Sequence, residues 1–263
     1  MQLPIVYFNH LSRQGNTIVH FVSTRLGGVS NDSFSSLNLG KYQGDAQYNV
    51  DTNRKVLASS LGFSPTSMVF AKQVHGCNVA RVDSLLPEGQ EAGGDSDIPD
   101  TDGMVTNVRG ICLVTLAADC VSLIFFDPVK KAVGVAHAGW QGTVKRIGSE
   151  VIHAMSREYG SLPADILVGI GPSIGPCCYE VGYDVVRAAT ASFGRAKGVI
   201  LSSTRFNNPV LNLWYANTIT LTEAGVMPQN IEAAMTCTKC HQSKYFSARG
   251  GDKGRFGAGV MLI

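Results

Sequence analysis

Three residues in separate motifs could bind one zinc ion. His75 lies in KQVHG, Cys120 ends AADC and His137 begins HAGW. Cys120 and His137 each follow an apolar run, and strand ends that lead into glycine-containing loops often carry functional groups. Two imidazoles and a thiolate suit zinc, and three protein ligands leave a fourth position for water or substrate. The spacing alone fits a buried cysteine beside packed histidines equally well.

Residues beside these three could serve an open zinc site. A bound zinc ion would lower the pKa of water toward about 7 or polarise a substrate atom. Asp119, directly before Cys120, could orient a histidine ligand, or it could satisfy backbone N–H groups instead. Gly139, Gln141 and Gly142 lie between a strand and a helix start, where unpaired N–H groups favour an anion. A tight turn without any ligand explains that pattern as well.

Basic and polar residues in other motifs are candidates for substrate contact. Arg25 in TRLGG, Arg249 in SARGG and Arg255 in KGRFG all lie in glycine-rich segments. Arginine binds phosphate through a planar pair of donors, although an isolated arginine is usually solvated. We therefore take Arg25 and Arg249 as candidate substrate ligands. Further candidates for substrate orientation or proton transfer are Lys72 and Gln73, from KQVHG, and Asp119.

Four more cysteines form two close pairs. Cys177 and Cys178 end GIGPSIGPCC, whose glycines and prolines predict a rigid loop closing over the site. Cys237 and Cys240 belong to CTKCH, which matches both the haem c attachment pattern and half of a zinc site. Haem c requires export, so we expect free thiols in both pairs. A zinc site shared between the pairs is the alternative, should the two loops meet in space.

Alternating strands and helices must position these residues. Short runs rich in β-branched and aromatic residues predict strands at 18–24, 111–116, 121–126, 132–136 and 166–170. Apolar periodicity and terminal glycines predict helices at about 52–61, 143–159, 184–193 and 213–224. The polar stretch 87–102 predicts a surface loop.

This order of elements predicts an α/β fold of the mixed α+β kind, with mixed β-sheets flanked by helices. Asp127-Pro128 predicts a hairpin turn between two of the strands, so the sheet is not expected to be purely parallel. No linker or internal repeat divides the sequence, and we expect one domain over residues 1–263.

Composition restricts the class of protein. With 44% hydrophobic and 16% charged residues, the 263-residue chain suits a folded core. A net charge of +2 gives no reason to expect nucleic-acid binding. No run approaches the roughly 18 apolar residues of a membrane span, and the first residues do not resemble a secretory signal. We expect a cytoplasmic protein, favour a monomer, and expect neither a membrane nor a nucleic-acid partner.

Ordered motifs over nearly the whole chain resemble the laccase-domain family, also called multicopper polyphenol oxidoreductase or YfiH-like. The matches are TRLGGVS, SLNLG, the GD–NR segment, KQVHG, TDGMVT, AADC, AHAGW-GT, GIGPSIGPCCYEVG, LNLW-AN, and CTKC with FSARGG-KGR. In that family the His of QVHG, the Cys of ADC and the His of HAGW form the metal site. The resemblance therefore implies that His75, Cys120 and His137 are metal ligands, within a compact α/β fold.

The resemblance implies more than one activity. Members are described as copper-dependent phenol oxidases and as cytoplasmic amidases that edit peptidoglycan precursors. Others are described as purine nucleoside enzymes that phosphorolyse adenosine, inosine and methylthioadenosine and deaminate adenosine. Six histidines are too few for a trinuclear copper cluster beside a mononuclear site, so we expect zinc, with copper as the alternative cofactor. Our first hypothesis is the purine nucleoside enzyme, with nucleoside and phosphate as substrates.

Other functions stay as alternatives: the amidase, the phenol oxidase and a protein whose zinc is structural. A fourth protein ligand would indicate the last of these. The sequence also departs from the family in its substrate motifs. Gln141 stands where the family usually has arginine, which could weaken phosphate binding, and Ala248-Arg249-Gly250 replaces a more aromatic and basic run.

Overall fold

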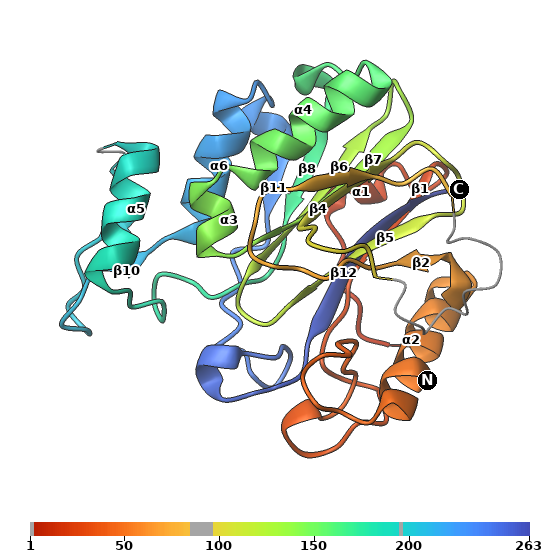
Figure 1. Cartoon of the computed structure of the whole chain (residues 1–263), viewed down its shortest axis with the longest axis horizontal. Coiled ribbons are helices and arrows are strands. Elements are labelled where there is room, and N and C mark those ends of the chain that lie inside the picture. Colours follow the sequence, from red (N-terminus) through yellow and green to blue (C-terminus); the bar gives the residue numbers. More distant parts are fainter. Residues whose placement is uncertain (1–2, 85–96, 195–196) are drawn as a thin grey trace.

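The computed structural model of this protein describes residues 3–84, 97–194 and 197–263. In these residues two β-sheets face each other, and helices cover the outer side of each sheet (Figure 1). The predicted fold class, mixed sheets flanked by helices, is confirmed.

The larger sheet has six strands in the order β11-β8-β6-β7-β4-β3. Their bounds are Ile231–Ala233, Leu167–Ile170, Val121–Asp127, Ala132–Ala138, Gly103–Thr106 and Val79–Arg81. Strands β6 and β7 form the predicted hairpin, and the Asp127 carboxylate accepts the N–H groups of Val129 and Lys130 in its turn. Strands β8 and β11 run parallel, as do β3 and β4, so the sheet is mixed.

The smaller sheet has four strands in the order β1-β12-β5-β2. Their bounds are Ile18–Val22, Phe256–Leu262, Cys112–Ala117 and Met68–Val69. Strand β12 comes last in the chain, yet it lies inside the sheet and pairs antiparallel with both β1 and β5. Two further strands, β9 (Ile200–Leu201) and β10 (Val210–Leu211), pair antiparallel in a separate two-stranded sheet.

The α-helices of the described residues are α1 to α6: Asn9–Ser12, Gln47–Leu61, Trp140–Val144, Ile147–Tyr159, Tyr183–Phe193 and Leu213–Glu223. Short 3-10 turns occupy Asp32–Phe34, Pro65–Ser67, Pro163–Asp165, Pro228–Asn230 and Ala248–Gly250. Left-handed glycines end α2 and α4, as the sequence predicts. Helix α2 begins at Gln47, earlier than predicted.

The prediction of one helix over 143–159 is wrong at its start. Helix α3 ends at Val144, and α4 begins at Ile147 after Arg146 adopts a left-handed φ of 61°. The Arg146 guanidinium contacts the carboxylate of Glu223 and donates to the carbonyl of Ser192 at 2.8 Å. The break between α3 and α4 thus coincides with contacts from Arg146 to other parts of the chain, which the local sequence does not predict.

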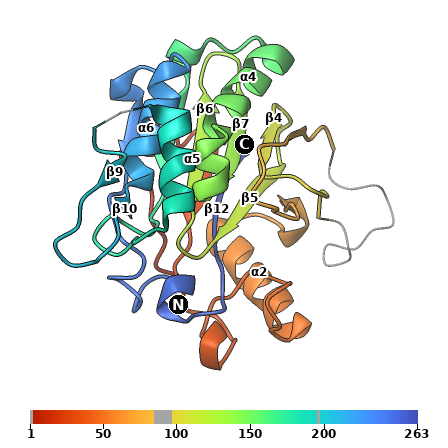
Figure 2. The same ribbon diagram turned by 60° about the vertical axis from the view of Figure 1, so that its left-hand side comes forward.

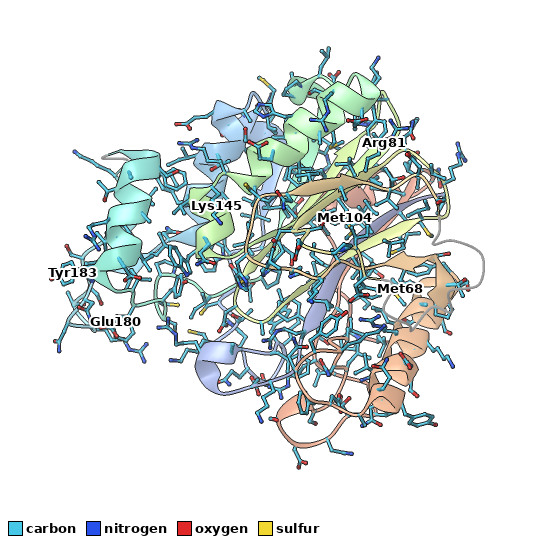
Figure 3. The ribbon with its side chains drawn as sticks, viewed as in Figure 1. Met68, Arg81, Met104, Lys145, Glu180 and Tyr183 are labelled. Carbon is cyan, nitrogen blue, oxygen red and sulfur yellow. The ribbon has the colours of Figure 1, made fainter. Side chains whose placement is uncertain are left out.

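The core follows the period-two alternation of the central strands. On β6, Leu123 and Phe125 face the helices and pack in one cluster with Val151 of α4. Ile124 and Phe126 face the other way and pack against the smaller sheet. Met104 on β4 belongs to that second cluster and is labelled in the interior of the molecule in Figure 3. One strand therefore contributes to two hydrophobic layers.

Helix α2 covers the far face of the smaller sheet, apart from the other long helices (Figure 2). Its Asn53 amide donates to the carbonyl of Asn38 at 2.8 Å and accepts the N–H of Val29. The Arg54 guanidinium donates to the carbonyl of Leu39 at 2.8 Å and stacks on the Phe70 ring. The GD–NR motif therefore fixes the segment around residues 29–39.

Candidate metal centre

His75, Cys120 and His137 meet at one point of the fold, as the sequence predicts. The Cys120 Sγ lies 3.9 Å from the His75 Nε2, and the two imidazole centroids are 4.8 Å apart in an edge-to-face arrangement. One ligand atom from each residue lies within 4.8 Å of the others. The three side chains are therefore close enough to share one ion.

Three different segments supply these side chains. His137 lies on β7 opposite Ser122 of β6, and Cys120 comes directly before β6. His75 lies in the loop after β2 and has a left-handed φ of 59°. Asp119 has a φ of 88°, in a region that aspartate tolerates better than most residues. That turn brings Cys120 to the sheet edge where His137 lies.

Asp102, directly before β4, holds two of the ligands in place. Its Oδ1 lies 2.9 Å from the His137 Nδ1. Its two oxygens also accept three successive backbone N–H groups, from Val74, His75 and Gly76, at 2.7–3.1 Å. Successive N–H groups of this kind form a nest for an anion. Asp102 thus fixes the left-handed turn at His75 and the ring orientation of His137.

Asp102 is not among the candidate site residues that the sequence motifs indicate. It falls in the stretch 87–102 predicted as a surface loop, of which 87–96 lie outside the described residues. For Asp102 that prediction is wrong, because its exposed fraction is only 1%. The signal available was TDGMVT, in which an aspartate directly precedes an apolar strand.

The charges of the site support a thiolate. Burial opposes ionisation of Cys120, but the neighbouring His137 charge and hydrogen bonds from both histidines lower the pKa of its thiol. Burial likewise opposes protonation of His137, yet the Cys120 thiolate and Asp102 raise the pKa of the imidazole. Metal binding requires a deprotonated thiol, and the lowered pKa of Cys120 favours that form.

Asp119 and Gln73 brace the walls of the site. The Asp119 carboxylate accepts the hydroxyl of Thr238 at 2.6 Å and the backbone N–H of Arg249 at 2.7 Å. Asp119 therefore contacts a backbone N–H and a hydroxyl, whereas the carboxylate that contacts a histidine of the centre is Asp102. The Gln73 amide donates to the carbonyl of Leu116 and accepts its N–H, both at 2.8 Å.

A cavity of about 670 Å³ opens beside the ligands. Its walls carry three basic side chains, Lys72, Arg249 and Arg255, and aromatic rings of Tyr179 and Trp140. The Arg249 guanidinium carbon lies 5.3 Å from the centroid of the Tyr179 ring. The cavity thus offers cationic and aromatic surfaces next to the candidate centre.

Arg25, a candidate substrate ligand, is not among the residues that line this cavity. Its guanidinium pairs with Asp252 at 3.1 Å and donates to the carbonyls of Ser35 and Gln242. It also stacks on Phe246, 4.6 Å from the ring centroid. Its Nε and Nη1 thus bond within the protein.

Gly139 contributes through its lack of a side chain. A Cβ there would lie 2.9 Å from the His75 Cδ2 and 3.0 Å from the Cys120 Sγ. At Gly142 a Cβ would lie 3.2 Å from two carbonyl oxygens. Gln141 and Gly142 are not among the residues that line the cavity, and α3 has only five residues. The turn is therefore closely packed against the candidate ligands, as in a tight turn without a ligand, the alternative that the sequence leaves open.

The donor set fits zinc. Two imidazoles and one thiolate are typical zinc ligands, and among the described residues no fourth His, Cys, Asp or Glu joins this group. Cys177, Cys178, Cys237 and Cys240 form a second group of their own. The first site therefore has the three-ligand composition of an open centre.

The fold and the site together define the class of protein. It is a mixed α+β protein with a candidate His–Cys–His metal centre where strands β6 and β7 of the larger sheet begin and end. The family described as "Multi-copper polyphenol oxidoreductase laccase" matches residues 19–263. The chain belongs to this family, and the resemblance seen in its motifs is confirmed.

Relatives of the chain carry nucleoside-enzyme names. The "Purine nucleoside phosphorylase YlmD" of Bacillus subtilis is 36% identical over 256 residues, covering 96% of this chain and 90% of that protein. The "Adenosine deaminase RL5" of an unknown prokaryotic organism is 33% identical, covering 92% and 93%. The crystal structure of YlmD from Geobacillus stearothermophilus matches with a TM-score of 0.87 and 34% identity, covering 93% and 92%.

In the part of the chain that the structure describes, no helix is both long and apolar enough to cross a bilayer.

Proposed function

We propose that this chain is a zinc-dependent purine nucleoside enzyme, which phosphorolyses adenosine, inosine and methylthioadenosine and deaminates adenosine. The observation that carries the proposal is the three-ligand centre beside a cavity with cationic and aromatic walls. The names of the two relatives support the substrate class. A purely structural zinc would be expected to have a fourth protein ligand, and the described residues supply none.

His75, Cys120 and His137 would hold the ion. When bound, zinc supplies a Lewis acid that polarises a substrate oxygen or activates water. Asp102 orients His137 through its Nδ1, which leaves the Nε2 for the metal. Asp119 keeps Cys120 at the sheet edge through its bonds to Thr238 and Arg249.

The cavity walls would bind the rest of the substrates. In phosphorolysis a phosphate oxygen bonds to the ribose C1′ while the bond from C1′ to the base nitrogen breaks, and the base takes a proton. Lys72, Arg249 and Arg255 are the cations placed to offset the phosphate charge. In deamination water adds at the purine C6 and ammonia leaves. Tyr179 and Trp140 offer flat apolar faces for the base.

The test is a direct assay of zinc-loaded protein. Inosine with phosphate, adenosine alone, a muramyl-serine amide and a phenol are incubated separately, and products are separated by chromatography. We expect ribose 1-phosphate with hypoxanthine from the first and inosine from the second. Cys120→Ala should abolish both reactions, whereas His153→Ala, an exposed histidine on α4, should leave them unchanged.

Each other outcome has a definite meaning. Turnover of the amide alone would replace the nucleoside enzyme with the amidase. Phenol oxidation by a parallel sample loaded with copper, and not by the zinc-loaded protein, would assign the oxidase activity of the family's description to this chain. Tight zinc binding without turnover of any substrate would indicate a structural ion.

A further inference from the structure

Two loops bring the remaining paired cysteines together. Cys177 and Cys178 follow β8, and Cys237 and Cys240 follow β11. Because β8 and β11 are parallel neighbours, these loops leave the sheet at the same edge. Ser173 bridges them, since its N–H donates to the carbonyl of Thr236 and its carbonyl accepts the N–H of Thr238, both at 3.1 Å.

The sulfur atoms are spaced as metal ligands would be. The Cys240 Sγ lies 3.6 Å from the Cys177 Sγ and 3.5 Å from the Cys178 Sγ. All four sulfurs lie within 4.8 Å of one another. Four thiolates about 2.3 Å from a tetrahedral zinc are about 3.8 Å apart, whereas a disulfide requires about 2.05 Å. The arrangement therefore fits a shared ion better than a bond between two sulfurs.

The cluster combines a fixed base with an open side. Cys178 and Cys237 are buried, while Cys177 and Cys240 are exposed, so an ion could enter from solvent. The base is tightly packed, because a Cβ at Gly175 would lie 2.5 Å from the Trp214 ring and 3.2 Å from the Cys237 Cβ. The outer loop continues to Glu180, which Figure 3 places at the rim of the molecule beside the start of α5.

We propose that these four cysteines form a second metal site, which binds a structural zinc ion through four thiolates. A set of four sulfur ligands favours zinc or iron–sulfur chemistry over hard cations. The ion would fasten the loop after β8 to the loop after β11. This replaces the expectation of free thiols with the alternative left open by the sequence, and it does not depend on the proposed function.

The second site would also steady the first. Thr238 lies between two of the proposed ligands, and its hydroxyl donates to Asp119, the residue before Cys120. Ile174 and Tyr179, from the other fastened loop, line the cavity. The four-cysteine site thus holds one wall of the candidate active site without contacting the substrate.

Metal content measured by mass spectrometry tests the proposal. Protein purified without chelators should contain two zinc ions per chain. His137→Ala should keep one and Cys240→Ser should keep one, whereas the double variant should keep none. Cys240→His, which retains a ligand, should restore two, and Cys77→Ser, outside both groups, should leave two.

A spectroscopic measurement covers the case of a variant that fails to fold. In His137→Ala protein, X-ray absorption at the zinc edge should show sulfur ligands alone at about 2.3 Å. Cobalt substitution of the same protein should give intense thiolate-to-metal absorption. His137→Ala protein without bound zinc, iron in place of zinc at the four sulfurs, or a disulfide between these cysteines in unreduced protein would each overturn the proposal.

Discussion

Among single residues, Asp102 links the most parts of the metal centre. One carboxylate binds His137 and three consecutive N–H groups of the His75 turn. The sequence indicates the three candidate ligands because His and Cys commonly bind metals and because their motifs resemble those of the family. It could not identify their support, because an aspartate before a strand has many uses and this one acts across a sequence separation of 35 residues.

Asp102→Asn should weaken zinc binding while the fold remains. The asparagine amide nitrogen can only donate, whereas the three backbone N–H groups of the nest need an acceptor. Mutation of a residue that hydrogen-bonds to a metal-binding histidine typically lowers metal affinity by about 10- to 100-fold. Competition with a chromophoric chelator measures the affinity. Asp83→Asn, which alters an exposed ion pair, is the control, and equal affinities in the two variants would rule out this role for Asp102.

Gly139→Ala should displace the side chains of His75 and Cys120. Its Cβ would lie 2.9 Å from the His75 ring and 3.0 Å from the Cys120 sulfur, and overpacking of this kind costs about 1–3 kcal/mol. We expect reduced zinc affinity and lower turnover, with an unchanged far-ultraviolet circular dichroism spectrum. Gly15→Ala is the control: its Cβ would lie 3.2 Å from the carbonyl oxygen of Ser12, at an exposed turn away from the site, so zinc affinity and turnover should stay unchanged. Full activity of the Gly139 variant would mean that the ligands can shift without loss.

Arg25→Ala should lower stability without a selective effect on phosphate. Removing the guanidinium leaves Asp252 and two carbonyls without their charged donor, a loss of about 1.5–3 kcal/mol. Urea unfolding measures this loss. The KM for phosphate should stay near the wild-type value. A large rise in that KM without loss of stability would restore Arg25 as a phosphate ligand.

Among the elements, the long buried strands are the ones the sequence predicts best. β5, β6 and β7 lie within two residues of their predicted ends, because continuous β-branched and aromatic runs have few other interpretations. β2 and β3 have only two and three residues, too short for any periodicity. The break at Arg146 depends on Glu223 and Ser192, which are far along the chain.

Strand β1 carries a source of acid sensitivity. Burial, with some repulsion from His10, lowers the pKa of His20 to about 4, and its Nε2 accepts the N–H of Phe8 at 2.9 Å. An unfolded histidine titrates near 6.5, so the unfolded chain binds more protons between these values. His20 should thus cost up to about 3 kcal/mol of stability as the pH falls from about 6.5 to 4.

The contribution of His20 can be isolated by a double difference. Urea unfolding at pH 7.5 and pH 5 is compared between wild type and His20→Gln, whose amide oxygen can still accept a hydrogen bond. The variant should lose less stability than wild type on acidification. The effects of acid on all other groups are the same in both proteins and cancel in the difference between them. An identical loss in both proteins would assign the sensitivity elsewhere.

For the whole molecule, the sequence predicts a class of fold but not how its two sheets meet. That contact lies between faces of strands distant in the chain, such as β6 and β12, and no local pattern specifies it. The cavity depends on the same arrangement. Its basic walls come from residues 72, 249 and 255, which only the folded chain brings together.

We propose that residues 1–263 unfold as one domain, since β6 contributes to the layers on both of its faces. Phe126→Ala removes a fully buried ring between the sheets and should cost about 3–5 kcal/mol. Tryptophan fluorescence and circular dichroism should shift together in urea. Val129→Ala, at an exposed turn, should shift neither, and two separate transitions would contradict a single unit.

The central position of β12 governs the order in which the protein can be completed during synthesis. The chain enters the ribosome's exit tunnel from its N-terminal side, so β1 and β5 emerge long before β12, which separates them in the sheet. Until residues 256–262 appear, both strands have unpaired edges that can recruit strands of other chains. Translation that stalls before β12 would therefore release an aggregation-prone product, although all three candidate metal ligands, His75, Cys120 and His137, have already been made.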